Sequence, residues 1–159
     1  MRSMKRFALF VSVLALLFSS ACNRAPAPGK VGQKLDYKGF ELTVLDVRVS
    51  DDLPGARKAR AGYNLVAVQV GIENSGGRSG AHWDPAHTRL IERSTGAQHK
   101  ARTTGMEPQL PAVSDITKGQ PLTGWVTYEV PDNARALNFE YELPSSFDHL
   151  ILKVMLDQR

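Results

Sequence analysis

The sequence of 159 residues predicts an all-β protein, namely an immunoglobulin-like antiparallel β-sandwich of about seven strands behind a cleaved signal peptide and a short tether. Apolar residues recur with a period of two along most of the chain, as they do in half-buried strands. Gly, Pro, Asn and Asp separate these runs at short intervals. After Cys22, no window of eleven or more residues keeps the 3.6-residue period of a helix together with capping signals.

The first 21 residues are predicted to form a secretory signal peptide. Its amino-terminal region is positive, because it carries Arg2, Lys5 and Arg6. The apolar run of residues 7–18 follows and ends in small residues. This run is too short for a membrane-spanning helix but has the length of a signal-peptide core.

The segment around Cys22 resembles a lipobox, the processing signal of bacterial lipoproteins. Ser20, Ala21 and Cys22 fit its pattern, whereas Ser19 stands where Leu is commonest. The resemblance implies attachment of diacylglycerol to the Cys22 sulfur, cleavage before Cys22, and acylation of the new amino terminus. The alternative is ordinary secretion, because Ser19 and Ala21 also satisfy the small-x-small rule for soluble exported proteins.

Three segments are therefore expected: the signal peptide (1–21), a Pro- and Ala-rich tether (22–31) and one sandwich domain (32–159). Asn23 follows the cysteine where retention at the inner membrane is usually marked by Asp, which favours the outer membrane if the host has one. Cys22 is the only cysteine, so no internal disulfide can form and packing must stabilise the domain.

The charge of the chain gives no reason to expect a nucleic-acid partner. The whole chain has 20 Lys and Arg residues against 16 Asp and Glu residues, a formal net charge of +4. Three of the basic residues and none of the acidic ones lie in the leader, so the mature chain has a net charge of about +1.

The first two long strands are expected at residues 40–49 and 63–74. In the former, Phe40, Leu42 and Val44 share one face. The phase then shifts, which predicts a bulge or a strand that changes sheets, with Leu45, Val47 and Val49 on the other face. The latter is rich in β-branched residues and is expected to be a central strand.

The remaining strands follow in order. Residues 88–93 and 98–103 flank a turn and predict a hairpin. Residues 122–130 form the next alternating run. Residues 137–143 alternate most regularly and predict a half-buried strand, and residues 150–156 complete the domain.

Three of these runs resemble an immunoglobulin-like bacterial family known as domain of unknown function 4352. Tyr63–Asn74 is similar to its strand with alternating valines, Arg89–His99 to its hairpin, and Lys118–Pro131 to its segment that ends in Val-Pro. The resemblance covers roughly residues 31–143 and implies a β-sandwich displayed outside the cytoplasm. The family has no shared catalytic residues, so the resemblance implies no active site.

A loop rich in histidine offers one possible metal site. His82, Asp84 and His87 lie within six residues and could bind Zn²⁺ or Cu²⁺ together with His99 or His149. The alternative is a structural loop in which Asp84 and Pro85 form a turn and Trp83 packs under a sheet edge. This spacing matches no ordered metal signature, and we expect no bound cofactor.

A short basic loop offers a possible contact with anionic lipid or cell-wall polymer. Arg57, Lys58 and Arg60 lie between the first two long strands. The alternative is a solvated loop whose charge is neutralised by Asp51, Asp52 or Glu73. Similarly, Trp83, Trp125, Tyr63 and Tyr128 could line a ligand patch, although aromatic residues at strand positions are more often core residues.

The sequence contains no serine-hydrolase elbow, zinc-protease motif, phosphate-binding loop or paired cysteines. We therefore expect a non-enzymatic protein of the cell envelope, held at the membrane through lipidated Cys22. Its sandwich would bind another envelope protein or cell-wall polymer, or serve a structural role. The alternative function is a small metal-handling or ligand-delivering envelope lipoprotein that uses the loop histidines.

Overall fold

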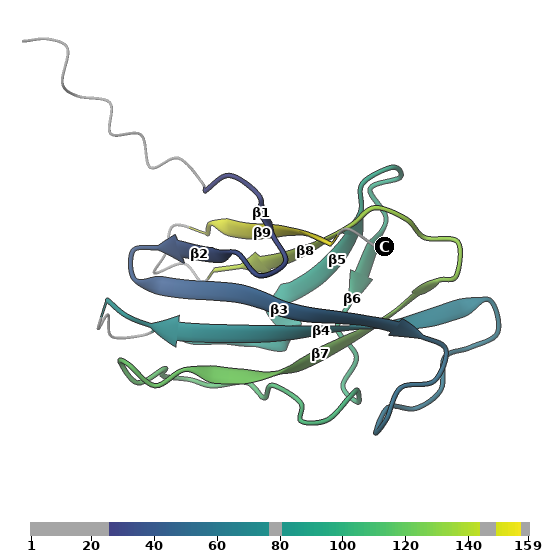
Figure 1. Cartoon of the computed structure of the whole chain (residues 1–159), viewed down its shortest axis with the longest axis horizontal. Helices are drawn as coiled ribbons and strands as arrows, with labels where there is room; N and C mark the ends of the chain where they lie inside the picture. The colour runs from purple at the N-terminus through teal and green to yellow at the C-terminus, as the bar shows by residue number, and fades with distance from the viewer. Residues whose placement is uncertain (1–25, 77–80, 144–148, 157–159) are drawn as a thin grey trace, which may run out of the picture.

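The protein folds into two β-sheets packed face to face, which confirms the predicted sandwich (Figure 1). The computed structural model describes residues 26–76, 81–143 and 149–156, so the leader and Cys22 lie outside the described residues. Sheet A has the strand order β1 (Gly29–Lys30), β9 (Ile151–Leu156), β8 (Leu137–Glu142), β5 (Thr88–Glu92) and β6 (Gln98–Lys100). Sheet B has the order β2 (Lys34–Tyr37), β3 (Phe40–Ser50), β4 (Tyr63–Asn74) and β7 (Leu122–Pro131).

The seven predicted strands correspond to β3 through β9, and β4 lies inside its sheet as expected. The described residues contain two further strands, β1 and β2, which are too short for a period of two to reveal them. β1 lies within the segment that the sequence assigns to the tether, and it pairs in parallel with β9. No helix in the described ranges has the length and apolar character needed to cross a membrane.

A β-bulge interrupts β3 where the sequence predicts a shift of phase. Val44 and Val47 are three positions apart on β3 but pair with β4 residues only two positions apart. The extra residue returns Val47 to the core side and leaves Leu45 exposed. The expectation that Leu45, Val47 and Val49 share the outer face was therefore wrong. The bulge adds one residue to β3, so that Val47 faces the same side of the sheet as Val44, while Leu45 faces the other side.

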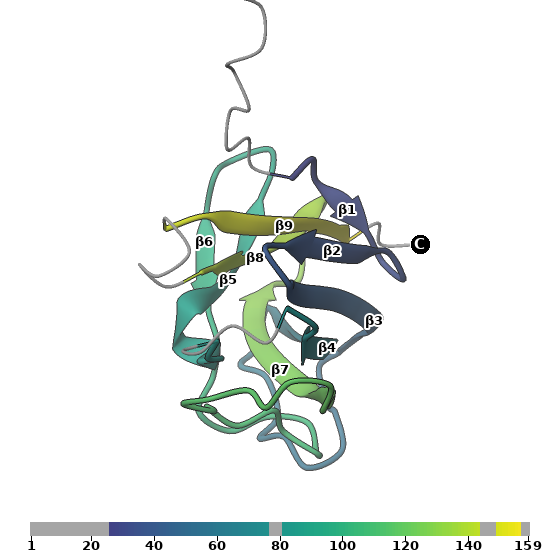
Figure 2. The same cartoon turned by 90° about the vertical axis from the view of Figure 1, so that its left-hand side faces the viewer.

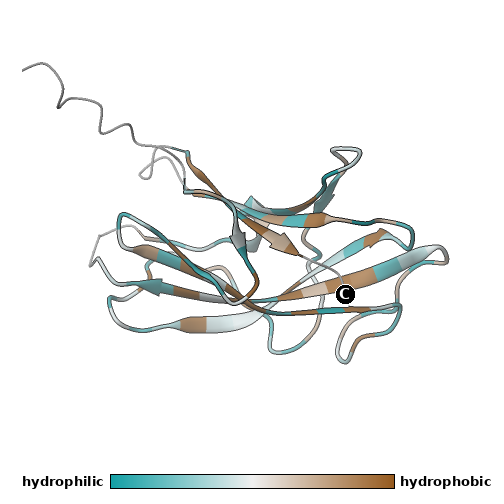
Figure 3. Cartoon of the chain, turned by 45° about the horizontal axis from the view of Figure 1, so that its top comes forward, coloured by the Kyte–Doolittle hydropathy of each residue, from teal (hydrophilic) through white to brown (hydrophobic). Residues whose placement is uncertain are grey.

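The main core lies between the sheets, and hydrophobic and hydrophilic residues alternate along the strands that enclose it (Figure 3). Its largest side chains are aromatic. The Trp83 and Tyr141 ring centroids are 4.7 Å apart, and those of Phe40 and Tyr141 are 5.7 Å apart. Trp83 is only 1% exposed, and its backbone pairs with that of Val113. It therefore packs inside the sandwich, as in the structural alternative for the histidine loop.

β8 is buried on both faces, which corrects the prediction of a half-buried strand. Its apolar positions face the core as expected, but Asn138 and Glu140 on the outer face are only 7% and 6% exposed. β8 lies between β5 and β9, and long side chains from both neighbours cover it. Arg89 Nε lies 3.2 Å from one Glu140 carboxylate oxygen, and Lys153 Nζ lies 2.8 Å from the other.

Two loops, residues 51–62 and 101–113, cover half of the outer face of sheet B. There they form a second hydrophobic cluster, whose buried members are Leu53, Leu65, Ala67, Met106 and Trp125. Residues 108–110 also cap the edge of β7: the Leu110 N–H donates to the Trp125 carbonyl, and the Trp125 N–H donates to the Pro108 carbonyl. This approach requires Gly124, because a Cβ there would lie 2.7 Å from the Leu110 nitrogen.

A chain of buried hydrogen bonds joins the two sheets. The Tyr128 hydroxyl of β7 donates to Thr88 Oγ1 of β5 at 2.5 Å. The Thr88 hydroxyl donates in turn to the Pro85 carbonyl at 2.7 Å, in the short 3-10 helix η1 (Pro85–His87). Both hydroxyl groups thus have partners in a region without solvent.

Candidate binding surface

The histidine loop does not assemble the metal-binding set that the sequence allows. The imidazole centroids of His82 and His87 are 6.3 Å apart with the rings tilted by 59°. Asp84 caps η1, because its carboxylate accepts a hydrogen bond from the Ala86 N–H at 2.8 Å. The His82 carbonyl accepts a hydrogen bond from the Tyr141 hydroxyl at 2.9 Å.

The other two histidines lie elsewhere. His99 is on β6 opposite Leu90, a core residue, and its Nε2 is buried without a hydrogen-bond partner. His149 is exposed with a positive φ of 51°. In the described ranges, no three His, Cys, Asp or Glu side chains form a group that could hold a metal ion. The arrangement gives the metal hypothesis no support.

The aromatic residues proposed for a ligand patch do not share an exposed surface. Trp83 and Tyr128 belong to the main core, and Trp125 belongs to the second cluster. Burial raises the pKa of the Tyr128 phenol well above its ordinary value, despite the hydrogen bond to Thr88. Tyr63 is half-buried, and the Arg60 guanidinium lies 4.1 Å from its ring centroid. Trp83, Tyr128 and Trp125 are therefore core residues, as in the alternative to a ligand patch.

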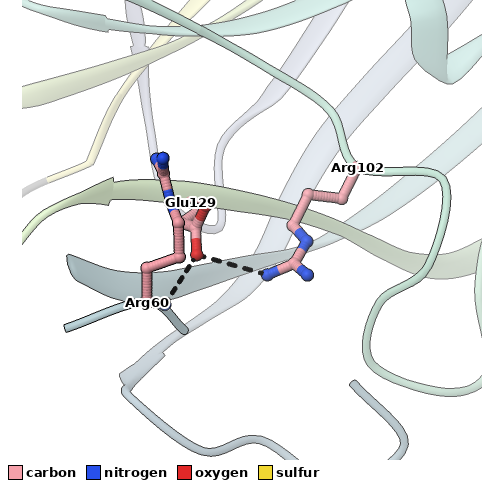
Figure 4. Close-up of polar contacts among 3 residues, drawn as sticks. All are labelled: Arg60, Arg102 and Glu129. Atoms are coloured by element: carbon pink, nitrogen blue, oxygen red, sulfur yellow. Dashed lines mark hydrogen bonds and ion pairs between the residues drawn. The ribbon is translucent and has the colours of Figure 1, made fainter. Parts of the chain in front are cut away.

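The basic loop is partly neutralised by contacts within the domain (Figure 4). The Glu129 carboxylate accepts hydrogen bonds from the Arg60 backbone N–H and Nε, both at 2.9 Å, and lies 3.7 Å from Arg102. The Arg60 backbone hydrogen bond, aided by both guanidinium charges, lowers the pKa of the Glu129 carboxyl below its ordinary 4.5. Lys58 lies 3.2 Å from Asp51, one of the acidic residues expected from the sequence to neutralise the charge of this loop. The contact with Glu129 was not predicted, because it spans 69 residues.

The position of this loop also argues against contact with the membrane at the tether. In Figure 1, the described chain starts at the top and the 51–62 loop lies at the bottom. Figure 2 shows the same opposition after a 90° turn. The loop therefore points away from the side on which the tether enters.

The open half of the outer face of sheet B forms a shallow groove. Strands β2, β3, β4 and β7 each contribute to it. Leu45, Gly71 and Pro121 supply apolar surface, and the polar side chains are those of Lys34, Glu41, Thr43, Glu73 and Thr123. Leu45 is 46% exposed, which makes it one of the few large apolar side chains on the described surface. A groove of this kind offers apolar contact area to a bound partner, and the polar side chains around it can fix the orientation of that partner.

Three carboxylates line up across β2, β3 and β4, and two of them, Glu41 and Glu73, line the groove. Asp36 on β2 is directly opposite Glu41 on β3, which is directly opposite Glu73 on β4. Lys34 donates a hydrogen bond to Glu41, and this bond lowers the pKa of the Glu41 carboxyl below its ordinary 4.5. Asp36 and Glu73 make no hydrogen bond or ion pair within the described part of the chain.

Like charges directly opposite each other destabilise a sheet by a few tenths of a kcal/mol or more, and in this row Lys34 offsets part of the repulsion through its contact with Glu41. Sequence reasoning missed this row, because β2 was not predicted and the register of β3 on β4 depends on the bulge.

Several solved structures have a similar fold. The yjhA protein of Bacillus subtilis is 16% identical with a TM-score of 0.65, over 81% of this chain and 99% of that one. MPT63, a secreted protein of Mycobacterium tuberculosis, is 13% identical with a TM-score of 0.57, over 84% of this chain and 98% of that one.

The ycdA protein of Bacillus subtilis, described as a candidate lipoprotein, is 14% identical with a TM-score of 0.59 over 78% of this chain. The chain spans only 38% of the length of that protein. At such identities the likeness is one of fold alone.

No curated protein matches the sequence significantly. A family model, by contrast, matches residues 29–149, which include every strand of the sandwich except the last. This range is wider than the resemblance seen in the three sequence motifs, since it begins at β1. The chain belongs to the family described as domain of unknown function (DUF4352).

Proposed function

We propose that the protein is a lipid-anchored, non-catalytic module of the bacterial cell envelope. Its sandwich would bind another envelope component through the groove on sheet B. The anchor rests on the position of Cys22 directly after an apolar signal-peptide core. The descriptions of two proteins of similar fold, one a candidate lipoprotein and the other a secreted protein, support a location outside the cytoplasm.

The row of carboxylates at the groove carries the binding part of the proposal. A fold selected for stability alone would place opposite charges across neighbouring strands, yet Asp36, Glu41 and Glu73 face one another. Local conflicts of this kind are expected where a surface serves function. With Lys34 neutralising Glu41, Glu73 remains available beside the apolar surface of Leu45 and Pro121, and Asp36 remains available at the β2 end of the row. The partner would present a basic group next to apolar surface.

The anchor is tested by replacing Cys22 with Ser and separating membrane from soluble fractions of the cells. The native chain should sediment with membranes and incorporate a labelled fatty acid. The Cys22→Ser variant should do neither. A variant that remains membrane-bound would refute anchoring through Cys22.

The groove is tested by photo-crosslinking in intact cells. A photoreactive residue at Thr123 lies in the groove and is exposed, whereas the same residue at Gln98 lies on the exposed edge strand of sheet A. Thr123 should give a discrete crosslinked species that Gln98 does not give, and Glu73→Lys should abolish it. Identical patterns from both positions, or persistence with Glu73→Lys, would show that the groove is not the binding surface.

A further inference from the structure

The two outer faces of the sandwich carry opposite charges. Side chains that alternate with core residues along a strand point to solvent. On sheet A, including the residue that follows β5, five of these are basic and two are acidic: Lys30, Arg89, Arg93, Lys100 and Lys153 against Glu140 and Glu142. On the strands of sheet B the numbers are reversed: Asp36, Glu41, Asp46, Glu73 and Glu129 against Lys34 and Arg48.

The excess positive charge on sheet A is accessible. Glu140 is buried between Arg89 and Lys153, and Arg89 also lies 3.8 Å from Glu142, so these two cations are balanced by two carboxylates and the excess lies on the other basic residues. Lys30 and Lys100 are exposed and form no ion pair within the described residues. The loops that cover half of sheet B add four basic and three acidic residues, so that side remains acidic. The domain therefore has a basic face and an acidic face.

The tether joins the domain at one edge of the sandwich, where β1 of sheet A and β2 of sheet B both lie near the start of the described chain. Gly29 begins β1, which is an edge strand of sheet A, and it lies only seven positions after Cys22. Fully extended, seven residues span about 24 Å. Figure 1 and Figure 2 both show β9 and β8 of sheet A nearer to the start of the described chain than β4 and β7 of sheet B. An anchor at Cys22 would thus hold sheet A close to the membrane.

We propose that the outer face of sheet A is a docking surface for anionic phospholipid headgroups, so that the anchored domain lies with this face on the bilayer and the sheet B groove turned outward. This inference rests on the anchor assigned above to Cys22. Each basic residue close to an anionic surface favours contact by about fivefold, so Lys30 and Lys100 together favour the docked orientation by about twenty-five-fold at moderate salt.

The unique cysteine allows a test that does not depend on acylation in the cell. The chain that begins at Cys22 is coupled through its thiol to maleimide-bearing lipid in vesicles. These are made of phosphatidylcholine, either alone or with about one third phosphatidylglycerol. Lysine acylation is then quantified residue by residue by mass spectrometry. Lys30, Lys100 and Lys153 report on sheet A, and Lys34 and Lys118 serve as internal controls away from it.

On the anionic vesicles, acylation of the three sheet A lysines should fall at least threefold relative to the neutral vesicles, with Lys34 and Lys118 unchanged. Salt at about 1 M should restore it, because the Debye length then shrinks to about 3 Å. Equal labelling on the two vesicle types would overturn the docking proposal, whatever the fate of the Cys22→Ser variant in cells.

A pair of double variants separates a docking face from a general effect of net charge. Lys30→Glu with Lys100→Glu changes two exposed residues of sheet A. Arg57→Glu with Lys118→Glu makes the same change of charge at exposed sites elsewhere. Only the former should abolish protection of Lys153 on anionic vesicles. Equal loss in both double variants would refute a specific face.

Discussion

The hydrogen bond that joins the two sheets allows a sharp test of how the sandwich is held together. The Tyr128 hydroxyl is fully buried and donates only to Thr88, whose own hydroxyl donates to the Pro85 carbonyl. Tyr128→Phe removes the donor and leaves the Thr88 hydroxyl with its other partner. The free energy of unfolding should therefore fall by about 0.5–1.5 kcal/mol, the net value of one hydrogen bond.

Thr88→Val should cost more, although the two side chains have nearly the same shape. It strands the Tyr128 hydroxyl in the core, whereas the Pro85 carbonyl loses the Thr88 hydroxyl but keeps the Thr88 backbone N–H as a donor. A buried polar group without a partner costs about 1–3 kcal/mol. In the Thr88→Val background, Tyr128→Phe then removes a stranded group, so it should be neutral or stabilising.

The native protein, the two single variants and the double variant are compared by urea unfolding, with fluorescence of the two tryptophans as the probe. The expected coupling energy between the two substitutions is about 1–2 kcal/mol, with unchanged slopes of the unfolding transition. If Tyr128→Phe costs the same in both backgrounds, the hydroxyl groups do not depend on each other. The hydrogen bond between the sheets would then not contribute as described.

Three further predictions concern sheet B. Gly124→Ala should destabilise the domain by about 1–3 kcal/mol in urea unfolding, because the new Cβ would meet the Leu110 backbone. Gly71→Ala should change stability by less than about 0.5 kcal/mol, because its Cβ would meet only the flexible end of the Leu45 side chain at 3.3 Å. Equal effects would contradict the close approach at β7. Glu129→Gln should cost about 1–2 kcal/mol at pH 7. The pKa of the Glu129 carboxyl is lower in the folded state than in the unfolded state. Its contribution to the free energy of unfolding is therefore present above the unfolded pKa and is lost as pH falls below 4.5 through the folded pKa. If Glu129→Gln destabilised the domain as much at pH 3 as at pH 7, this reasoning would be contradicted. Glu73→Gln should raise stability by a few tenths of a kcal/mol and weaken the Thr123 crosslink, and a loss of stability would mean that the carboxylate row supports the fold.

The sequence predicted the long strands well, because each carries enough alternating residues for the period to be visible. Tyr63–Asn74 emerged as the inner strand β4 and residues 88–92 and 98–100 as a hairpin. β1 and β2 have only two and four residues, so no period could identify them. β2 nevertheless supplies Lys34 to the groove and Asp36 to the row of carboxylates, which is why the surface could not be predicted along with the fold.

The sequence also could not predict which side chains surround each polar residue. The alternation along residues 137–143 was correct, but whether Asn138 and Glu140 meet water depends on long side chains from strands distant in sequence. The same holds for Arg60, whose carboxylate partner is 69 residues away. Candidate sites predicted from short runs of residues, such as the histidine loop, assumed that neighbours in sequence converge. On a strand or around a proline turn, they point in different directions.

The outer face of sheet B separates the requirements of stability from those of binding. Its covered half has a hydrophobic cluster and loops that cap backbone groups at the edge of β7, and both serve the fold. Its open half has an exposed Leu45 that packs beside Gly71, and opposed carboxylates, none of which the fold needs. Substitutions in the covered half should therefore lower stability and affect binding only through unfolding. Substitutions of the carboxylates in the open half should alter binding while leaving stability equal or slightly higher, a combination that a purely structural face would not produce.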